Sequence, residues 1–486
     1  MGIVASQSFK NIITTYAGFI IGAISTLFLY TKFLTDDFYG MVGYMLSLAN
    51  VIMPLMAFGV QNTLVKFYSS FKTRVSVNSF LTLMLFLPIL IIIPIILIML
   101  FGYNTIASFL SEKNTIIKGY LWHTVFIAIS LSYFEVFFAW AKVQMLTVFG
   151  NFMKEVFHRV GAMLILFLLH FKVIDLEQFM WALVIIYVLR VLIMMVYAFS
   201  IKLPIITFKK VNNLKSILKY SFLIIVAGSI ATVLLDVDKV MLGKYLPNLR
   251  HIAYYNVAVY IAIVIAVPQR SMHQILLPLS AKYLNDKDFE SLSDLYKRSS
   301  LNLFIVSGFI FLLIVLNINQ LYFFIPVEYS VGLYVVLLIS VAKLYDALLG
   351  SNNAILFNSD YYRMVLVLGV VLVVLMIVLN IFLIPLYGIN GAALATFIAI
   401  FIYNSIKLFF VYRKFKILPF TTNTFKIACF ITLGVLVFYF WDFPFYPMVN
   451  IVLKSVLISL LYLYFVYKFN LSEDISLLIK RYLKFK

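Results

Sequence analysis

Several ionisable side chains lie within the long apolar stretches of this 486-residue sequence. Arg190, Arg270 and Lys343 are the basic ones, and His273 and Gln274 follow Arg270 at helical spacing. An ionisable group at the centre of a membrane helix costs ~2.5–3.5 kcal/mol on insertion scales, so each one needs a physical reason. Arginine suits phosphate because its planar guanidinium makes two parallel hydrogen bonds to phosphate oxygens. These five residues are therefore the candidate lining of a polar site for an anionic group.

Two carboxylates accompany these cations within the apolar stretches. They are Glu135 and Asp346, and Asp346 follows Lys343 by three residues. A carboxylate inside a membrane protein can take up H⁺ or Na⁺, so both are candidates for coupling transport to an ion gradient. Two alternatives remain open: Arg190 pairs with Glu135, or Lys343 pairs with Asp346, with no role in binding. Arg270 alternatively sits at the cytoplasmic interface.

The elements that position these residues are predicted to be transmembrane helices. The chain is 64% hydrophobic and 12% charged, whereas soluble proteins carry roughly 25% charged residues. Runs of ~20 apolar residues match the thickness of a bilayer, and about fourteen of them follow one another. We expect an all-α polytopic membrane protein with spans at 11–33, 41–63, 79–101, 120–141, 152–171, 178–201, 217–235, 252–278, 299–317, 331–350, 363–384, 391–411, 424–441 and 448–469.

The basic residues set the expected orientation. The net charge of +19 is explained by loops on one side of the membrane, because cytoplasmic loops collect Lys and Arg. An even number of spans then places both termini in the cytoplasm, with the first span a retained anchor. This account needs no nucleic acid as a partner.

An internal repeat predicts the domain organisation. The second span has Pro54 in its middle and the eighth has Pro268, with similar aromatic and basic flanks. Six spans before the repeat and six after it predict two parallel lobes, which usually hold substrate at their interface. The expected domains are residues 1–212 (N-terminal lobe), 213–417 (C-terminal lobe) and 418–486 (two further helices and a cytoplasmic tail).

Three short stretches carry a resemblance to a known family. They are residues 35–40 (TDDFYG), 235–243 (LDVDKVMLG) and 384–393 (IPLYGINGAA). Together with the span count, they resemble the polysaccharide flippases of the MOP superfamily, which are Wzx-type exporters related to MurJ lipid II flippases and to MATE drug exporters. One departure is Ile252-Ala253-Tyr254, where the family usually has Gly-x-Tyr after the seventh span. The sequence therefore assigns neither a subfamily nor a glycan.

The resemblance implies a flippase that moves a polyprenyl-diphosphate-linked oligosaccharide from the cytoplasmic to the outer leaflet for cell-surface polysaccharide biosynthesis. It implies the bacterial cytoplasmic (inner) membrane as the location, and other polysaccharide-assembly membrane proteins as partners. Our own hypothesis is that Arg270 and Arg190 face the cavity from opposite lobes and bind the diphosphate, with Lys343 assisting. H⁺ or Na⁺ is the expected coupling ion because the sequence has no G-x-x-x-x-G-K-[ST] loop for ATP.

A multidrug exporter and a membrane-embedded enzyme are the two alternative functions. A MATE-like multidrug exporter should have an acidic cavity for cationic drugs, whereas the intramembrane charges here lean basic. A membrane glycan polymerase or ligase needs a large external loop, but the longest predicted outside loops are 102–119 and 236–251. We therefore expect no enzyme, no catalytic residue and no cofactor. The single cysteine, Cys429, excludes a Cys-based metal site.

Overall fold

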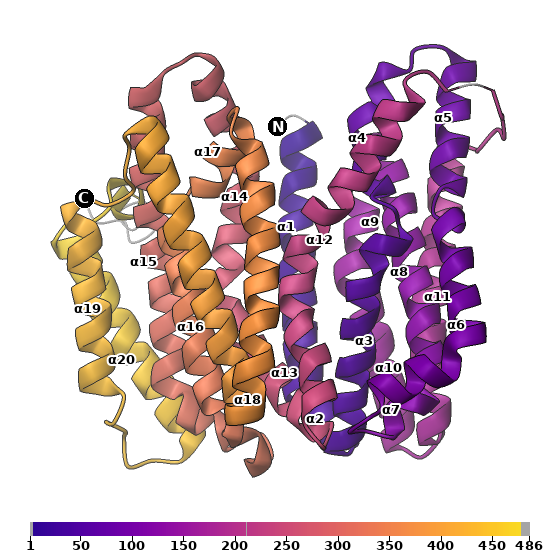
Figure 1. The fold of residues 1–486 in the computed structure, drawn as a ribbon. Coiled ribbons are helices and arrows are strands. Elements are labelled where there is room, and N and C mark those ends of the chain that lie inside the picture. The colour runs from indigo at the N-terminus through magenta and orange to yellow at the C-terminus, as the bar shows by residue number, and fades with distance from the viewer. Residues whose placement is uncertain (1–2, 210, 478–486) are drawn as a thin grey trace. The chain divides into compact units, whose positions relative to one another are not determined.

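The computed structural model describes residues 3–209 and 211–477, and every regular element in these ranges is a helix (Figure 1). Ten helical stretches in this part of the chain are long and apolar enough to cross a membrane, and Thr422–Phe438 is a shorter apolar helix. This confirms the predicted class of all-α polytopic membrane protein. The chain divides into two compact units, Met1–Asn256 and Val257–Lys486.

The first unit is built around α8, which packs between α3 and α11. The fully buried Trp140 and Phe134 of α8 and Phe80 of α5 belong to its core. The helices of this unit are α1 (Ile3–Ile24), α2 (Tyr30–Phe33), α3 (Asp36–Met56), α4 (Val60–Phe67), α5 (Arg74–Phe86), α6 (Ile89–Leu110), α7 (Ile116–Gly119), α8 (Leu121–Lys142), α9 (Val148–Phe152), α10 (His158–His170), α11 (Leu176–Ile201), α12 (Leu214–Tyr245) and the start of α13 (Arg250–Ile263). Two π-helical segments, η1 (Ser25–Leu29) and η3 (Met153–Phe157), and the 3₁₀ turn η2 (Tyr68–Ser70) complete it.

The second unit is organised by α15, which contacts α14, α16, α19 and α20 (Figure 1). Tyr462 of α20 is buried against α15 and donates a hydrogen bond to the Ile305 carbonyl at 2.8 Å. The helices that follow α13 are α14 (Val267–Asn285), α15 (Phe289–Tyr322), α16 (Leu333–Leu348), α17 (Asn352–Asn358), α18 (Tyr362–Phe415), α19 (Thr422–Phe438) and α20 (Pro447–Lys468). Two 3₁₀ turns, η4 (Val264–Ala266) and η5 (Val327–Gly332), lie between them.

The two repeat prolines both lie beside a helix break. Pro54 is near the end of α3, and the chain passes through Gly59, whose φ is +65°, before α4 begins. Pro268 is in the first turn of α14, directly after the 3₁₀ turn η4. Proline removes a backbone donor and clashes with the preceding turn, which fits the 3₁₀ turn before Pro268, whereas α3 continues for two residues past Pro54 before it ends.

The predicted lobes differ from the packing units. α12 packs against α3 and α4, so the first unit extends to Asn256 instead of ending at the predicted residue 212. The lobes 1–212 and 213–417 were inferred from a sequence repeat, which packing clusters do not measure. The division into those lobes and the segment 418–486 stays a prediction.

The predicted hinge between spans 363–384 and 391–411 lies within α18. At Gly388 the backbone has φ +56° and ψ −131°, which divides this 54-residue element into two helices. That combination is accessible essentially to glycine alone. An added Cβ at Gly388 would meet no atom within 4 Å, so the backbone conformation is the only reason for glycine here.

Gly388→Ala should therefore destabilise the protein by ~1–3 kcal/mol through backbone strain alone. Gly102→Ala in α6 is the matched control, because its Cβ would make an ordinary contact of 3.6 Å with Ile106 and alanine favours a helix. Thermal unfolding of both purified variants in detergent measures the difference. Equal melting temperatures for the two variants would contradict the strain argument.

Two clusters of charged side chains as a candidate site

Arg190 of α11 is deeply buried in the first unit. Its residue is 4% exposed, and the guanidinium carbon lies 3.8 Å from the centre of the Phe134 ring on α8. A cation over an aromatic face is stabilised by the ring quadrupole, which partly offsets the loss of water. Its Nε has no hydrogen-bond partner among the described residues. Arg190 is therefore a buried cation with donor capacity to spare.

Glu135 of α8 forms its ion pair with Lys154 and not with Arg190. Its Oε1 accepts a hydrogen bond from Lys154 Nζ at 2.6 Å, and Lys154 lies on the π-helical segment η3. Lys142 and Arg190 lie within electrostatic range of the same carboxylate. The predicted alternative of a direct Arg190–Glu135 pair is thus replaced by a Lys154–Glu135 pair.

Arg159 of α10 completes this group. Its guanidinium donates to the Gly18 carbonyl of α1 and lies 3.6 Å from Glu155. The predicted span 152–171 contains Lys154, Glu155 and Arg159, which the sequence analysis did not single out, although the i, i+4 spacing of Glu155 and Arg159 inside an apolar stretch was a usable signal. We call the following residues the first cluster: Glu135, Lys142, Lys154, Glu155, Arg159 and Arg190.

A second group of charges lies in the second unit. Asp346 of α16 accepts a hydrogen bond from Asn404 Nδ2 at 3.2 Å, and its backbone carbonyl accepts one from Gln269 Nε2 at 3.2 Å. Lys343 is half-buried and, within the described ranges, forms no ion pair with Asp346 or any other carboxylate. The predicted alternative of a closed Lys343–Asp346 pair is therefore absent there.

The other predicted residues of this site lie on α14. Arg270 is exposed on the surface of the second unit, and it lies within electrostatic range of Lys343. His273 lies within electrostatic range of Asp346. The side chain of Gln274 lies outside the described part of the chain.

Lys407 of α18 is a residue that sequence analysis missed. It is 1% exposed, its Nζ donates to Asn353 Oδ1 at 2.8 Å, and it lies 4.2 Å from the Tyr403 ring centre. It stands inside the predicted span 391–411, so the rule that found Lys343 would have found it too. We call Arg270, Lys343, Asp346 and Lys407 the second cluster.

Asp236 of α12 is a buried carboxylate whose hydrogen bonds hold neighbouring helices together. It is 7% exposed and accepts hydrogen bonds from Ser47 at 2.8 Å, from Asn50 at 3.1 Å and from Lys239 at 3.1 Å. Those partners occupy both carboxylate oxygens, which leaves little capacity for a ligand. Within residues 3–209 and 211–477, no three His, Cys, Asp or Glu side chains are grouped closely enough to hold a metal ion.

The two clusters share one electrostatic property. The first has four cations for two carboxylates, and the second has three cations for one carboxylate. Desolvated charges interact more strongly than charges in water because the local dielectric constant is low. Each cluster can therefore stabilise an anionic group that brings two or more negative charges and oxygen acceptors.

The fold and these clusters define a polytopic membrane protein with ionisable groups held among its helices. No protein-family model matches the sequence, and no curated protein matches it. Solved structures do match. A structure described as the lipid II flippase MurJ in an inward closed conformation is similar over 95% of this chain and 99% of its own, with TM-score 0.72 and 18% identity.

Two MATE structures match over a smaller share of this chain and with lower TM-scores. An inward-facing multidrug resistance MATE family transporter of the MOP superfamily is similar over 83% of this chain and 98% of its own, with TM-score 0.61 and 11% identity. A structure of the MATE multidrug transporter DinF-BH is similar over 85% of this chain and 95% of its own, with TM-score 0.54 and 12% identity. The chain therefore has the fold of MurJ and of the MATE transporters, as the sequence resemblance predicted.

Proposed function

We propose that this protein is a flippase for a polyprenyl-diphosphate-linked oligosaccharide. It would move this lipid from the cytoplasmic to the outer leaflet of the bacterial inner membrane by alternating access, for cell-surface polysaccharide biosynthesis. Its fold, shared with the lipid II flippase MurJ over 95% of the chain, supports a transport role without an enzymatic step. Arg190, Arg270 and Lys343 are the proposed contacts of the diphosphate.

The excess of cations in both clusters is the observation that carries this proposal. Arg190 keeps an unpartnered Nε within the described structure, and Lys343 has no carboxylate partner there. Retaining such groups among membrane helices is costly, and a bound anion would offset that cost. A diphosphate supplies the charge and the acceptors, while the polyprenyl tail stays in the lipid.

The test is a lipid extraction from cells that lack the protein. We expect a complete oligosaccharide to accumulate on its polyprenyl-diphosphate carrier, and the wild-type gene to clear it. Arg270→Ala should fail to clear it, whereas Arg298→Ala should succeed, because Arg298 is an exposed arginine outside both clusters. An unchanged lipid-linked pool in the deletion strain would overturn the proposal.

Asp346 is the carboxylate that we propose for ion coupling. Glu135 is engaged by Lys154 at 2.6 Å, whereas Asp346 accepts only neutral amide donors within the described residues. Asp346 also lies within electrostatic range of Lys343 and Lys407, so adding a proton or Na⁺ there would change the balance of the whole second cluster.

Asp346→Asn should therefore abolish the dependence of transport on an imposed H⁺ or Na⁺ gradient, with a loss of roughly tenfold or more in the gradient-driven rate. The measurement is translocation in proteoliposomes with and without each gradient. Glu135→Gln is the comparison, and we expect it to keep the dependence on the gradient. A normal gradient response in Asp346→Asn would exclude this residue as the coupling group.

A MATE-like multidrug exporter is the second candidate, and the similarity to the MATE structures favours it. The cation excess argues against it, because a cationic drug would be repelled by both clusters. Cells lacking the protein would then become sensitive to cationic dyes while their lipid-linked oligosaccharides stayed unchanged.

A further inference from the structure

The chain between α11 and α12 lies against the helices of the first unit without forming a helix or strand in its described residues. Trp140 Nε1 of α8 donates a hydrogen bond to the Lys202 carbonyl at 3.1 Å, and Thr207 N donates one to Thr82 Oγ1 of α5 at 3.1 Å. These contacts fix the beginning and the middle of the segment. We call residues 202–219, which continue into the first turns of α12, the linker.

The linker exposes large apolar side chains. Leu203, Ile206 and Phe208 are all more than half exposed, and Phe208 reaches 81%. The Phe208 ring centre lies 5.9 Å from that of Phe86, an exposed residue at the end of α5 and inside the predicted span 79–101. The apolar side chains of the linker therefore adjoin a stretch that is expected to face lipid, and acyl chains can cover them.

The linker is also strongly basic. Its sequence contains five lysines and no acidic residue. Lys209, Lys215 and Lys219 are exposed, and none of the three forms an ion pair within the described ranges. Their charges are therefore available to an anionic surface outside the protein.

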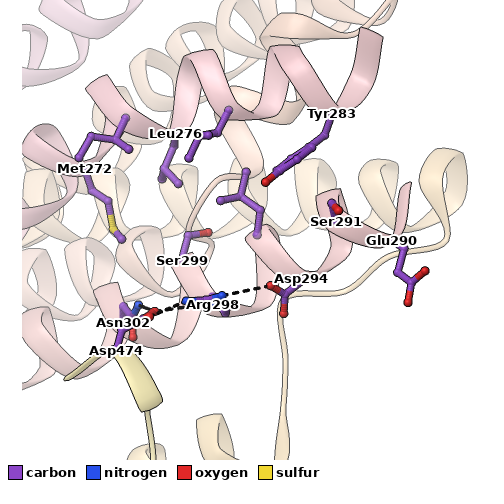
Figure 2. Close-up of a pocket in the computed structure, with 13 residues that line it drawn as sticks. Met272, Leu276, Tyr283, Glu290, Ser291, Asp294, Arg298, Ser299, Asn302 and Asp474 are labelled. Carbon is purple, nitrogen blue, oxygen red and sulfur yellow. Dashed lines mark hydrogen bonds and ion pairs between the residues drawn. The ribbon is translucent and has the colours of Figure 1, made fainter. Parts of the chain in front are cut away.

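An exposed cation of the second unit shows the contrast. Arg298 of α15 lies in the wall of a groove between α14 and α15, and Figure 2 shows it joined to two carboxylates. It contacts Asp474 at 2.5 Å and Asp294 at 3.5 Å. Exposure alone thus does not leave a cation without a carboxylate in this protein, whereas the three linker lysines have none in the described structure.

The exposed face of α12 changes its character just after these lysines. Lys215, Lys219 and Phe222 follow one another at positions i, i+4 and i+7, so they share one face of the helix. Phe222 is 64% exposed. A face that passes from lysine to an aromatic residue is typical of a helix that enters a bilayer from the headgroup layer. This pattern places the linker lysines at the level of the headgroups.

We propose that the linker binds the membrane surface, with its exposed lysines on anionic lipid headgroups and its exposed apolar side chains in the adjoining acyl layer. A lipid fits both parts of the linker, because free phosphate would leave the apolar side chains in water and zwitterionic lipid carries no net charge. On the expected topology, the lipid belongs to the cytoplasmic leaflet. The inference is independent of what the protein transports.

Limited trypsin digestion of the full-length protein in lipid nanodiscs tests this binding. Cleavage after Lys209 or the lysine that follows it divides the chain into two large fragments, which a gel separates. In discs of phosphatidylcholine this cleavage should be fast. Replacing about a third of the lipid with phosphatidylglycerol should slow it roughly tenfold, because a linker held on the headgroups cannot enter the protease.

Two paired substitutions identify the lysines responsible. Lys215→Gln with Lys219→Gln keeps the cleavage site and should remove most of the slowing, since each lysine near an anionic surface strengthens binding roughly fivefold. Lys282→Gln with Lys297→Gln is the matched control. It removes the same charge from exposed lysines of the second unit, and the slowing by phosphatidylglycerol should persist.

A third pair tests the apolar contacts. Leu203→Ser with Ile206→Ser keeps every lysine and should lose part of the slowing. Equal cleavage of the wild type in both kinds of disc would overturn the proposal. So would cleavage that is slow in both, because the protein itself would then protect the linker. Slowing that survives Lys215→Gln with Lys219→Gln as fully as it survives the control pair would also refute it.

Discussion

Replacing Arg190 with alanine should slow clearance of the lipid-linked oligosaccharide by roughly 10- to 150-fold. This range corresponds to the loss of one charged hydrogen-bonding partner, worth ~1.5–3 kcal/mol. Arg190 is 4% exposed, and its Nε has no partner in the described structure. Arg190→Lys should recover only part of the rate, because lysine keeps the charge but loses the planar fork. The measurement is the initial rate of oligosaccharide translocation in proteoliposomes.

Phe134→Leu separates substrate binding from packing. The Arg190 guanidinium stacks on the Phe134 ring at 3.8 Å, so this variant removes the stack and keeps the cation. We expect a modest loss of stability, ~1–2 kcal/mol, with transport per folded molecule retained. If Phe134→Leu and Arg190→Ala reduce transport equally at matched amounts of folded protein, then Arg190 has only a packing role.

Asp442→Asn should destabilise the protein strongly for a conservative substitution outside the helices, because Asp442 pairs with a buried lysine. The carboxylate accepts a hydrogen bond from Lys454 Nζ at 2.9 Å, and the Lys454 side chain on α20 is 0% exposed. Removing one partner of such a pair leaves a buried charge uncompensated, which costs ~3–5 kcal/mol. We expect the lower end, because the Asp442 side chain is 39% exposed and water partly screens the pair.

Lys454→Met is the informative comparison. Methionine fills a similar volume without a charge, so this variant should differ from the wild type by less than ~1 kcal/mol. The double variant Asp442→Asn/Lys454→Met should then regain most of the stability that Asp442→Asn loses. Thermal unfolding of the three purified variants decides the matter. A Lys454→Met variant as unstable as Asp442→Asn would show that the pair itself is strongly stabilising.

The helices could be predicted from the sequence because a bilayer imposes a length on every apolar run. Even the division of α18 was predicted, since Pro385 and Gly388 stand together between two such runs. The need for glycine at position 59 was harder to predict, because it depends on α12: an added Cβ would lie 2.5 Å from Ile224 and 2.6 Å from the Ser221 carbonyl oxygen. Hydropathy contains no information on which helices approach each other.

The candidate site was predictable in its residue types but only partly in its pairing. Hydropathy identified Arg190, Glu135 and Lys343, yet the partner of Glu135 is Lys154, which the sequence did not single out. Pairing depends on how each helix is rotated about its axis, and a π-helical segment such as η3 shifts that rotation locally.

The surplus of positive charge in the first cluster has an electrical consequence. If the protein carries a diphosphate as proposed, the two negative charges of the cargo would offset the two surplus cations of the first cluster, so the loaded protein would do less electrical work in the membrane field than the empty protein. The empty carrier would keep its charge, and a potential that is negative inside would act on it by ~2.3 kcal/mol per charge per 100 mV. The membrane potential would then drive the return of the empty protein rather than the delivery of its cargo.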